Sequence, residues 1–162
     1  MSDQAVGGRL SEAQLIAWGE TVGRQADSGA VFVALYGELG AGKSTLARAA
    51  CRGLGIVGAI PSPTFTLINV HQTEGGALHH ADLYRIDPDL DEASLQAVLV
   101  DAGWPGLLES DDTVFVEWAD RAAGWLPDDR WDIWLAFSPD PSTRDVSIVR
   151  RGTAPPPPEP PC

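Results

Sequence analysis

Two short, almost continuously apolar segments dominate the hydrophobic pattern of the chain, at residues 30–36 and 113–118. Apolar runs of this length, without regularly alternating polar residues, are typical of strands buried on both faces of a parallel sheet. The second run ends in an acid, Glu117. We therefore expect a parallel centre to the fold, with a polar group at one strand end.

Two pairs of more polar segments have the pattern of β-hairpins. Their strands are expected at residues 65–70 and 77–84, and at 130–137 and 144–150. Within each pair, turn-forming residues separate the two segments. The expected sheet is thus mainly parallel, with antiparallel hairpin strands added to it.

Helical spacing of apolar residues occurs between these strands. Ser11 and Gln14 have the spacing of a capping box and predict a helix over residues 12–27. Further helices are expected over residues 43–53 and after Asp91, and a break in the second of them is expected at residues 103–106. Helices interleaved with apolar strands indicate an α/β fold, a single domain with a central sheet flanked by helices.

The last ten residues differ from the rest in composition. One folded domain is expected over residues 1–152, long enough for a substantial core. Residues 153–162 are mostly proline and predict a disordered tail of the polyproline type.

Charge and composition narrow the classes of function. The formal net charge is −12 and the isoelectric point is about 4.4, which disfavours independent binding of nucleic acid. The sequence holds no apolar run of about 18 residues and no visible secretion signal, so no membrane association is expected. Cys51 and Cys162 lack the spacing of metal ligands. We expect reduced thiols and a cytoplasmic protein.

The segment Gly37–Ser44 matches the phosphate-binding loop pattern G-x-x-x-x-G-K-[ST] and lies between a predicted strand and a predicted helix. Lys43 is the only lysine in a chain whose other basic residues are all arginine. Backbone N–H groups and the positive end of a helix dipole bind phosphates in such loops. The candidate nucleotide-binding residues are Glu38, Leu39, Gly40, Ala41, Gly42, Lys43, Ser44 and Thr45.

A nucleotide site of this kind also requires Mg²⁺ and therefore hard oxygen ligands. The hydroxyl of Ser44 is the first candidate, and an acid at a neighbouring strand end is the second. Glu117 and Asp82 both qualify. We favour Glu117 for the metal, and Asp82 for water positioning, catalysis or an indirect metal contact. The alternative for each is a solvated acid at a strand end.

Residues of four other types, near the motif or in the predicted strands, have candidate roles in the site. Thr64 could respond to the γ-phosphate as part of a switch loop, or cap a turn. Trp118 could flank the nucleotide base or pack in the core. Arg121 could reach a phosphate or lie on the surface. His79 and His80 are adjacent in a predicted strand, so they should point to opposite faces and not form a metal pair.

Several nucleotide-dependent families are excluded by what the sequence lacks. Asn69 is the only asparagine, so the Asn-Lys-x-Asp segment that reads guanine is impossible. Small-molecule kinases carry an arginine-rich lid, whereas Arg85 is alone between residues 81 and 118. An ATP-using protein without a visible acceptor site remains.

Four motifs in order resemble the TsaE (YjeE) family. They are the phosphate loop through Thr45, then Ser62-Pro63-Thr64-Phe65, Asp82-Leu83-Tyr84-Arg85 and Val116-Glu117-Trp118. The resemblance extends over residues 10–151. The family often continues with Pro-Glu, where this chain has Ala119 and Asp120, so the role of Asp120 stays open.

The resemblance implies an ATPase needed for threonylcarbamoyladenosine modification of tRNA at position 37. It implies TsaB and TsaD as partner subunits, with tRNA held only indirectly through them. On the matching positions, Lys43 and Ser44 hold phosphate and Mg²⁺, Glu117 is the acid on the metal side, and Asp82 serves hydrolysis. Thr64 falls in the switch-like segment. A nucleotide-dependent binding module and a small kinase remain as alternatives.

Overall fold

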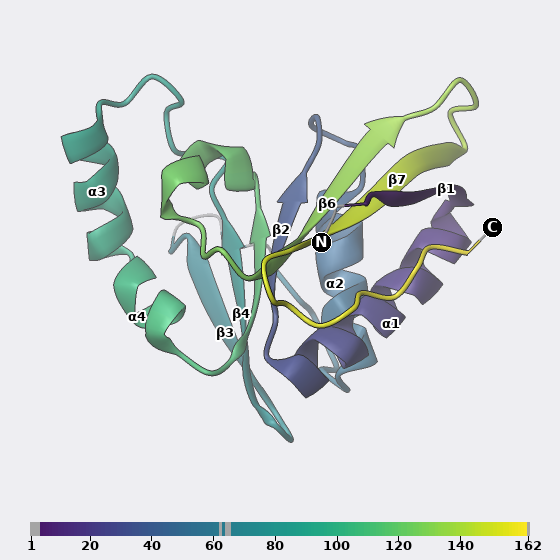
Figure 1. The fold of residues 1–162 in the computed structure, drawn as a ribbon, viewed down its shortest axis with the longest axis horizontal. Helices are drawn as coiled ribbons and strands as arrows, with labels where there is room; N and C mark the ends of the chain where they lie inside the picture. The colour runs from purple at the N-terminus through teal and green to yellow at the C-terminus, as the bar shows by residue number, and fades with distance from the viewer. Residues whose placement is uncertain (1–3, 62, 64–65, 162) are drawn as a thin grey trace.

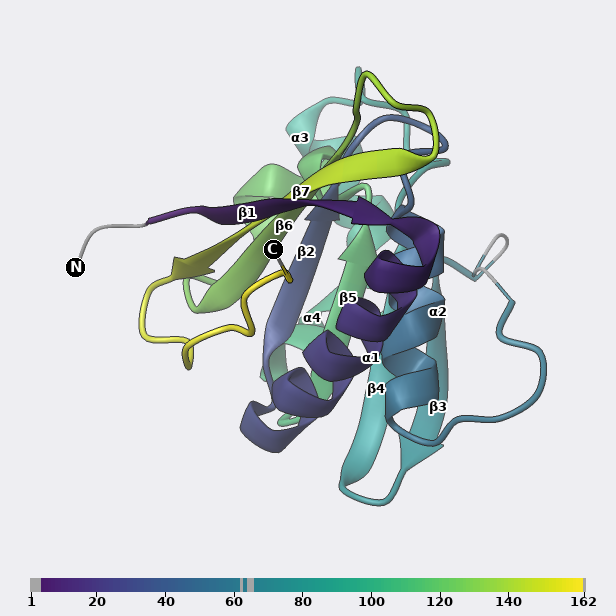
Figure 2. The ribbon, with the colours of Figure 1, turned by 90° about the vertical axis from the view of Figure 1, so that its right-hand side faces the viewer.

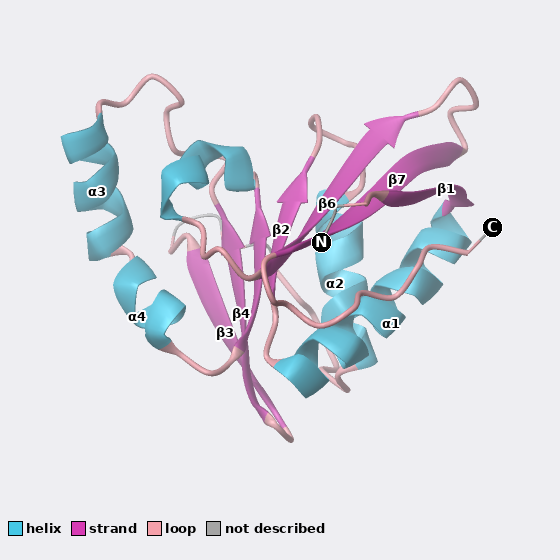
Figure 3. Ribbon diagram, in the orientation of Figure 1, coloured by secondary structure: helices cyan, strands magenta, loops and turns pink. Residues whose placement is uncertain are grey.

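The computed structural model describes residues 4–61, 63 and 66–161 as an α/β fold with one central sheet (Figures 1 and 3). The strands are β1 (Val6–Ser11), β2 (Phe32–Tyr36), β3 (Ile68–Thr73), β4 (Gly76–Asp82), β5 (Thr113–Glu117), β6 (Arg130–Phe137) and β7 (Thr143–Arg151). The helices are α1 (Glu12–Gly29), α2 (Lys43–Gly53), α3 (Glu92–Asp101), α4 (Trp104–Glu109) and the 3₁₀ helix η1 (Ala119–Trp125). Among the described residues, no helix is long and apolar enough to cross a membrane.

The seven strands form a single mixed sheet in the order β1-β7-β6-β2-β5-β4-β3. The central pairs β6–β2, β2–β5 and β5–β4 are parallel, and the outer pairs are antiparallel. The prediction of a mainly parallel centre with antiparallel hairpin strands is confirmed. Because parallel strands end at the same edge, the carboxyl ends of β2, β4 and β5 lie together.

Helices cover both faces of the sheet (Figures 1 and 2). The pair α1 and α2 covers one face, and α3, α4 and η1 cover the other. Two glycines of α1 allow its close approach to α2. A Cβ added at Gly19 would lie 2.7 Å from the Cβ of Ala49, and one at Gly23 would lie 2.3 Å from the backbone oxygen of Ala50. The two helices therefore pack closely enough for their backbones to approach, and they form one layer.

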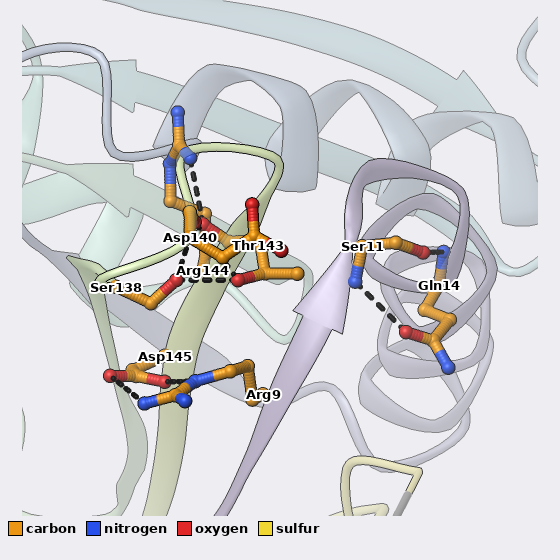
Figure 4. Close-up of polar contacts among 8 residues, drawn as sticks. All are labelled: Arg9, Ser11, Gln14, Ser138, Asp140, Thr143, Arg144 and Asp145. Atoms are coloured by element: carbon orange, nitrogen blue, oxygen red, sulfur yellow. Dashed lines mark hydrogen bonds and ion pairs between the residues drawn. The ribbon is translucent and has the colours of Figure 1, made fainter.

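Side-chain contacts fix the junction between β1 and α1 (Figure 4). The predicted capping box is present, since Ser11 Oγ accepts from the backbone N–H of Gln14 and Gln14 Oε1 accepts from that of Ser11, at 3.2 and 2.8 Å. Just before it, Arg9 and Asp145 are register partners in β1 and β7 and form an ion pair, with Nε and Oδ1 2.7 Å apart. This pairing holds the N-terminal strand beside the C-terminal one.

Three elements differ from the sequence-based expectation. The glycine-rich strand β1 was not predicted, because its pairing with β7 depends on tertiary contacts and not on local propensity. A break was expected around residues 103–106, whereas α4 begins there with its proline in the first turn, where no N–H is needed. The first hairpin is shifted, with strands at β3 and β4 around a turn at Glu74 and Gly75.

The proline-rich tail also differs from the prediction of disorder. The described residues 153–161 run along α1 and the adjacent edge of the sheet (Figure 1). Ala154 is part of the hydrophobic core, and backbone oxygens of Pro155 and Pro158 accept hydrogen bonds from the indoles of Trp131 and Trp18. Composition alone could not reveal these two donors, because they come from distant parts of the chain.

Candidate functional site

The candidate site lies where the carboxyl ends of β2, β4 and β5 meet the first turn of α2. Asp82 and Glu117 are register partners in the parallel strands β4 and β5, so their side chains emerge from the same face. On that face Leu78 and Phe115 pack into the core shared with α1 and α2. Side-chain alternation therefore directs both acids toward the start of α2.

The loop between β2 and α2 has the backbone geometry that its glycines predict. Gly37, Gly40 and Gly42 have φ angles of 149°, 83° and 115°, which side chains disfavour. A Cβ at Gly37 would also lie 2.4 Å from the backbone oxygen of Leu135, so this position requires glycine on two grounds. The loop delivers the chain into the N-terminus of α2, where unpaired backbone N–H groups attract anions.

Lys43 is folded back over the loop that precedes it. Its side chain is buried, and its Nζ donates to the backbone oxygens of Gly37 and of Glu38, the latter at 2.8 Å. The ammonium also lies 4.1 Å from the ring centroid of Trp118. Burial lowers the pKa of Lys43, and the nearby carboxylates, first that of Glu117, oppose this shift. The structure thus holds a cation at the mouth of the loop.

Glu117 is fixed by hydrogen bonds to both of its carboxylate oxygens. Ser44 Oγ donates to Oε1 at 2.6 Å, and the ring Nε2 of His80 lies 2.6 Å from Oε2. Glu117 and His80 are 1% and 0% exposed. Because an ionised carboxylate only accepts, this network assigns the N–H to His80 Nε2. The orientation of the Glu117 carboxylate is therefore set by two partners before any ligand arrives.

Asp82 has a looser environment than Glu117. One of its oxygens accepts the backbone N–H of Tyr84 at 3.0 Å, and the side chain is half-buried. Burial raises the pKa of Asp82, and the backbone N–H of Tyr84 opposes the shift. Asp82 therefore presents to the site a carboxylate with weaker constraints.

Trp118 closes one side of the site in an unusual backbone conformation. Its φ and ψ of 57° and 42° are left-handed, which is uncommon for a large residue and typical of functional sites. The Trp118 ring packs against Tyr84 at 5.0 Å between centroids and under the guanidinium of Arg121 at 5.1 Å. Arg121 also donates to the backbone oxygen of Tyr84 at 2.9 Å, so it braces the wall of the site.

A cavity of about 200 Å³ gathers most of the predicted residues. It is lined by Leu39, Gly40, Gly42, Lys43, Ser44, Thr45, Asp82, Tyr84, Glu117 and Trp118. The remaining loop residues lie beside it: Glu38 contributes its backbone oxygen to Lys43, and Ala41 is buried. Asp120 does not line the cavity but favours the charged form of Lys43. Thr64 lies outside the described residues.

A second cavity of about 290 Å³ lies on the other side of the glycine loop. It is bounded by the start of α1, the loop and the turn between β6 and β7, and it shares Gly40, Gly42 and Thr45 with the first. Arg144, near the start of β7, lies over the ring of Phe137 and near the backbone oxygen of Gly40. Space for a ligand larger than a phosphate chain is thus present next to the loop.

The donor set suits a hard divalent cation that is shared with a ligand. Ser44 Oγ and Glu117 Oε1 are the oxygens that Mg²⁺ prefers, and they already lie together. Within the described ranges, no cluster of three or more histidine, cysteine or acidic side chains could hold a metal by itself. Ser44 and Glu117 could therefore hold Mg²⁺ only together with oxygens from water or phosphate.

Sequence reasoning missed two residues of this site, His80 and Tyr84. The expectation that His79 and His80 face opposite sides is confirmed, since His79 contacts Asp112 and His80 contacts Glu117. The alternation of His80 with Asp82 could have placed both on one face. The cross-strand contact from His80 to Glu117 required the register of β4 with β5, which no local pattern gives.

Comparisons with known proteins agree with this fold and set of motifs. The family model described as "Threonylcarbamoyl adenosine biosynthesis protein TsaE" matches residues 10–146. The chain is 39% identical over 132 residues to "tRNA threonylcarbamoyladenosine biosynthesis protein TsaE" of Nostoc sp., covering 81% of this chain and 76% of that protein.

The same-named protein of Streptomyces coelicolor is 41% identical over 100 residues, 60% of this chain and 63% of that protein. The chain thus spans somewhat less than two thirds of that relative. The crystal structure of Bacillus subtilis YdiB superposes with a TM-score of 0.68 at 22% identity, covering 94% of this chain and 89% of that one, which supports the fold. The chain belongs to the TsaE family.

Proposed function

We propose that this protein binds and hydrolyses ATP with Mg²⁺ as a subunit required for threonylcarbamoyladenosine modification of tRNA at position 37. In this proposal it acts with TsaB and TsaD, and its ATP cycle permits their repeated turnover. The observation that carries the ATPase part is the convergence of Lys43, Ser44, Glu117 and Asp82 on one cavity at the N-terminus of α2.

In this proposal each of these side chains has one chemical role, which is consistent with its position in the cavity. Lys43 neutralises phosphate charge as a point cation on a flexible stem. Ser44 and Glu117 would hold Mg²⁺, and the metal would supply charge neutralisation at the phosphates. Asp82, which lines the cavity and accepts a single hydrogen bond from the described residues, orients the attacking water. Trp118 walls the nucleotide site.

A pure binding module would need the loop and its lysine but not a second placed acid. Asp82 at the same edge as Glu117 therefore favours hydrolysis over nucleotide-dependent binding alone. The role in tRNA modification rests on family membership and on the names of the relatives. The net charge of −12 supports a division of labour in which the partner subunits hold the tRNA.

The test is ATP hydrolysis by the protein alone and then with purified TsaB and TsaD. We expect low activity alone and a marked rise on mixing, because partner-dependent phosphate-loop ATPases complete their geometry in trans. ATP binding without any rise on mixing would contradict the partner assignment and favour the binding-module alternative.

A pair of variants on α2 tests the site itself. We expect Lys43→Ala to abolish ATP binding or turnover. The matched control is Arg48→Ala, which removes an exposed positive charge from the same helix but lies outside the cavity. Equal loss in both variants would indicate a general charge effect, and normal hydrolysis by Lys43→Ala would contradict the site assignment.

A further inference from the structure

The proline-rich segment Ala154–Pro161 contacts the domain through a set of features unrelated to the candidate ATP site. It runs along α1 next to β1, as the yellow end of the chain shows in Figures 1 and 2. Trp18 of α1 donates its indole N–H to the backbone oxygen of Pro158 at 3.2 Å. Trp131 of β6 donates its indole N–H to that of Pro155 at 2.7 Å.

The spacing of these two acceptors matches the polyproline II helix. That helix has three residues per turn and no internal hydrogen bonds, so the carbonyls of residues 155 and 158 lie on one side and are free to accept. Trp18 and Trp131 are 4% and 0% exposed, so within the described chain their N–H groups depend on these acceptors. The two indoles thus donate to carbonyls three residues apart along the segment. Domains that bind polyproline II peptides likewise use aromatic side chains to line their grooves.

The segment also has a buried side and an exposed side. Ala154, Pro158 and Pro160 are buried, whereas Pro155, Pro156 and Pro161 are exposed. A loose tail would bury none of these residues. The segment therefore docks with a defined rotation about its own axis.

Two glycines of the domain leave room for the segment. A Cβ at Gly8 of β1 would lie 3.0 Å from the backbone oxygen of Pro161 and 3.4 Å from the Cβ of Pro160. A Cβ at Gly29, at the end of α1, would lie 3.0 Å from Pro155 Cγ. Larger residues at these positions would push the prolines away from the domain.

We propose that Trp18, Trp131, Gly8 and Gly29 form a polyproline-binding groove whose occupant is this chain's own segment Ala154–Pro161. The groove recognises the backbone carbonyls and proline rings of a polyproline II segment, so it also accepts a proline-rich peptide once its own segment is released. The intramolecular occupant is favoured because β7 ends at Arg151, which leaves only two residues before Ala154 enters the core.

The first test compares two double variants of the full chain. Pro158→Ser with Pro160→Ser removes two buried rings, and Pro156→Ser with Pro161→Ser removes two exposed ones. Both pairs lose the same amount of polyproline stiffness, so only the groove contacts differ. The readouts are solvent exchange of the Trp18 and Trp131 indole N–H groups by NMR, assigned with Trp18→Phe and Trp131→Phe, and the thermal midpoint.

We expect the buried pair to speed exchange of the Trp18 indole at least about 10-fold and to lower the thermal midpoint by roughly 3–6 °C. The exposed pair should have less than half of either effect. Equal effects of the two pairs, or an unchanged indole exchange rate in both, would overturn the groove. The Trp104 indole, which is buried and donates to the backbone oxygen of Trp125, is the internal reference, because a general loss of stability would speed its exchange as well.

The second test uses a capped synthetic peptide of residues 154–161 in trans. Added at millimolar concentration to the buried-pair variant, it should slow exchange of the Trp18 indole again, while a peptide with every proline changed to serine should not. No slowing with the proline peptide would overturn recognition in trans. A wild-type dimer that exchanges its segments would overturn the intramolecular occupant.

Discussion

The ends of β4 and β5 occupy equivalent places in the sheet but surround their acids differently. Glu117 is buried and accepts hydrogen bonds from two side chains, Ser44 and His80. Asp82, its register partner, is half-buried and accepts one backbone N–H. A carboxylate held on both oxygens suits the fixed geometry of a metal site, and one with a free oxygen suits a mobile water. The fold supplies the location, and the neighbours decide the role.

The largest effect is expected from Glu117→Gln. It keeps the size of the side chain but removes the charge, so a magnesium-dependent ATPase should lose about 10²-fold or more in turnover. Steady-state hydrolysis measured across a Mg²⁺ titration checks this. The control is Glu109→Gln, an exposed acid at the end of α4, which should leave the rate unchanged. If the Mg²⁺ dependence of Glu117→Gln is unaltered, Glu117 is not a ligand of the metal.

The next largest effect is expected from Asp82→Asn. This variant should separate nucleotide binding from ATP hydrolysis. We expect hydrolysis to fall by about 10²-fold, the usual contribution of a positioned base, while nucleotide affinity changes by less than about 3-fold. Fluorescent nucleotide titration and single-turnover hydrolysis measure the two quantities. Loss of affinity together with activity would give Asp82 a structural or direct metal role.

His80 tests whether the fixed orientation of Glu117 matters. His80→Leu removes the donor to Glu117 Oε2 and should raise the Mg²⁺ concentration for half-maximal hydrolysis by about 10-fold, as loss of a partner behind a metal ligand does. His80→Gln, which can still donate, should recover part of this.

The control for His80 is its neighbour on the opposite face of β4. His79→Leu removes the contact to Asp112 and should not change the Mg²⁺ requirement. If both histidine variants lose stability while their Mg²⁺ requirement stays normal, His80 is part of the core and does not position Glu117.

The smallest predicted effect concerns stability and pH. The pKa of Asp82 is raised chiefly by burial, so the folded state binds more protons than the unfolded state between the ordinary pKa and the raised one. The stability contributed by this group therefore falls as pH rises through that window. Without nucleotide or Mg²⁺, Asp82→Asn should raise the thermal midpoint by about 1–3 °C at pH 7 and by nothing near pH 3.5. A lower midpoint at pH 7 would contradict this sign.

The parts of the fold that could be predicted from the sequence are those whose signals are local. The apolar runs of β2 and β5 and the capping box of α1 needed no tertiary information. Asp82 and Glu117 could be chosen as candidates because each lies at the end of a predicted strand, whereas their pairing required the register of β4 with β5. β1, the His80 contact and the seating of residues 154–161 depend on partners far along the chain, so neither spacing nor composition could show them.

The pairing of β1 with β7 has a consequence for how the protein is made. Arg9 finds Asp145 across a separation of 136 positions in the sequence. At ordinary rates of synthesis, the first strand waits on the order of ten seconds before its partner leaves the ribosome. During this time the edge of β1 is unpaired and α1 lacks its final neighbours. The pairing of β1 therefore cannot form until the C-terminal hairpin has been made, whereas the pairs among β2, β3, β4 and β5 can form earlier.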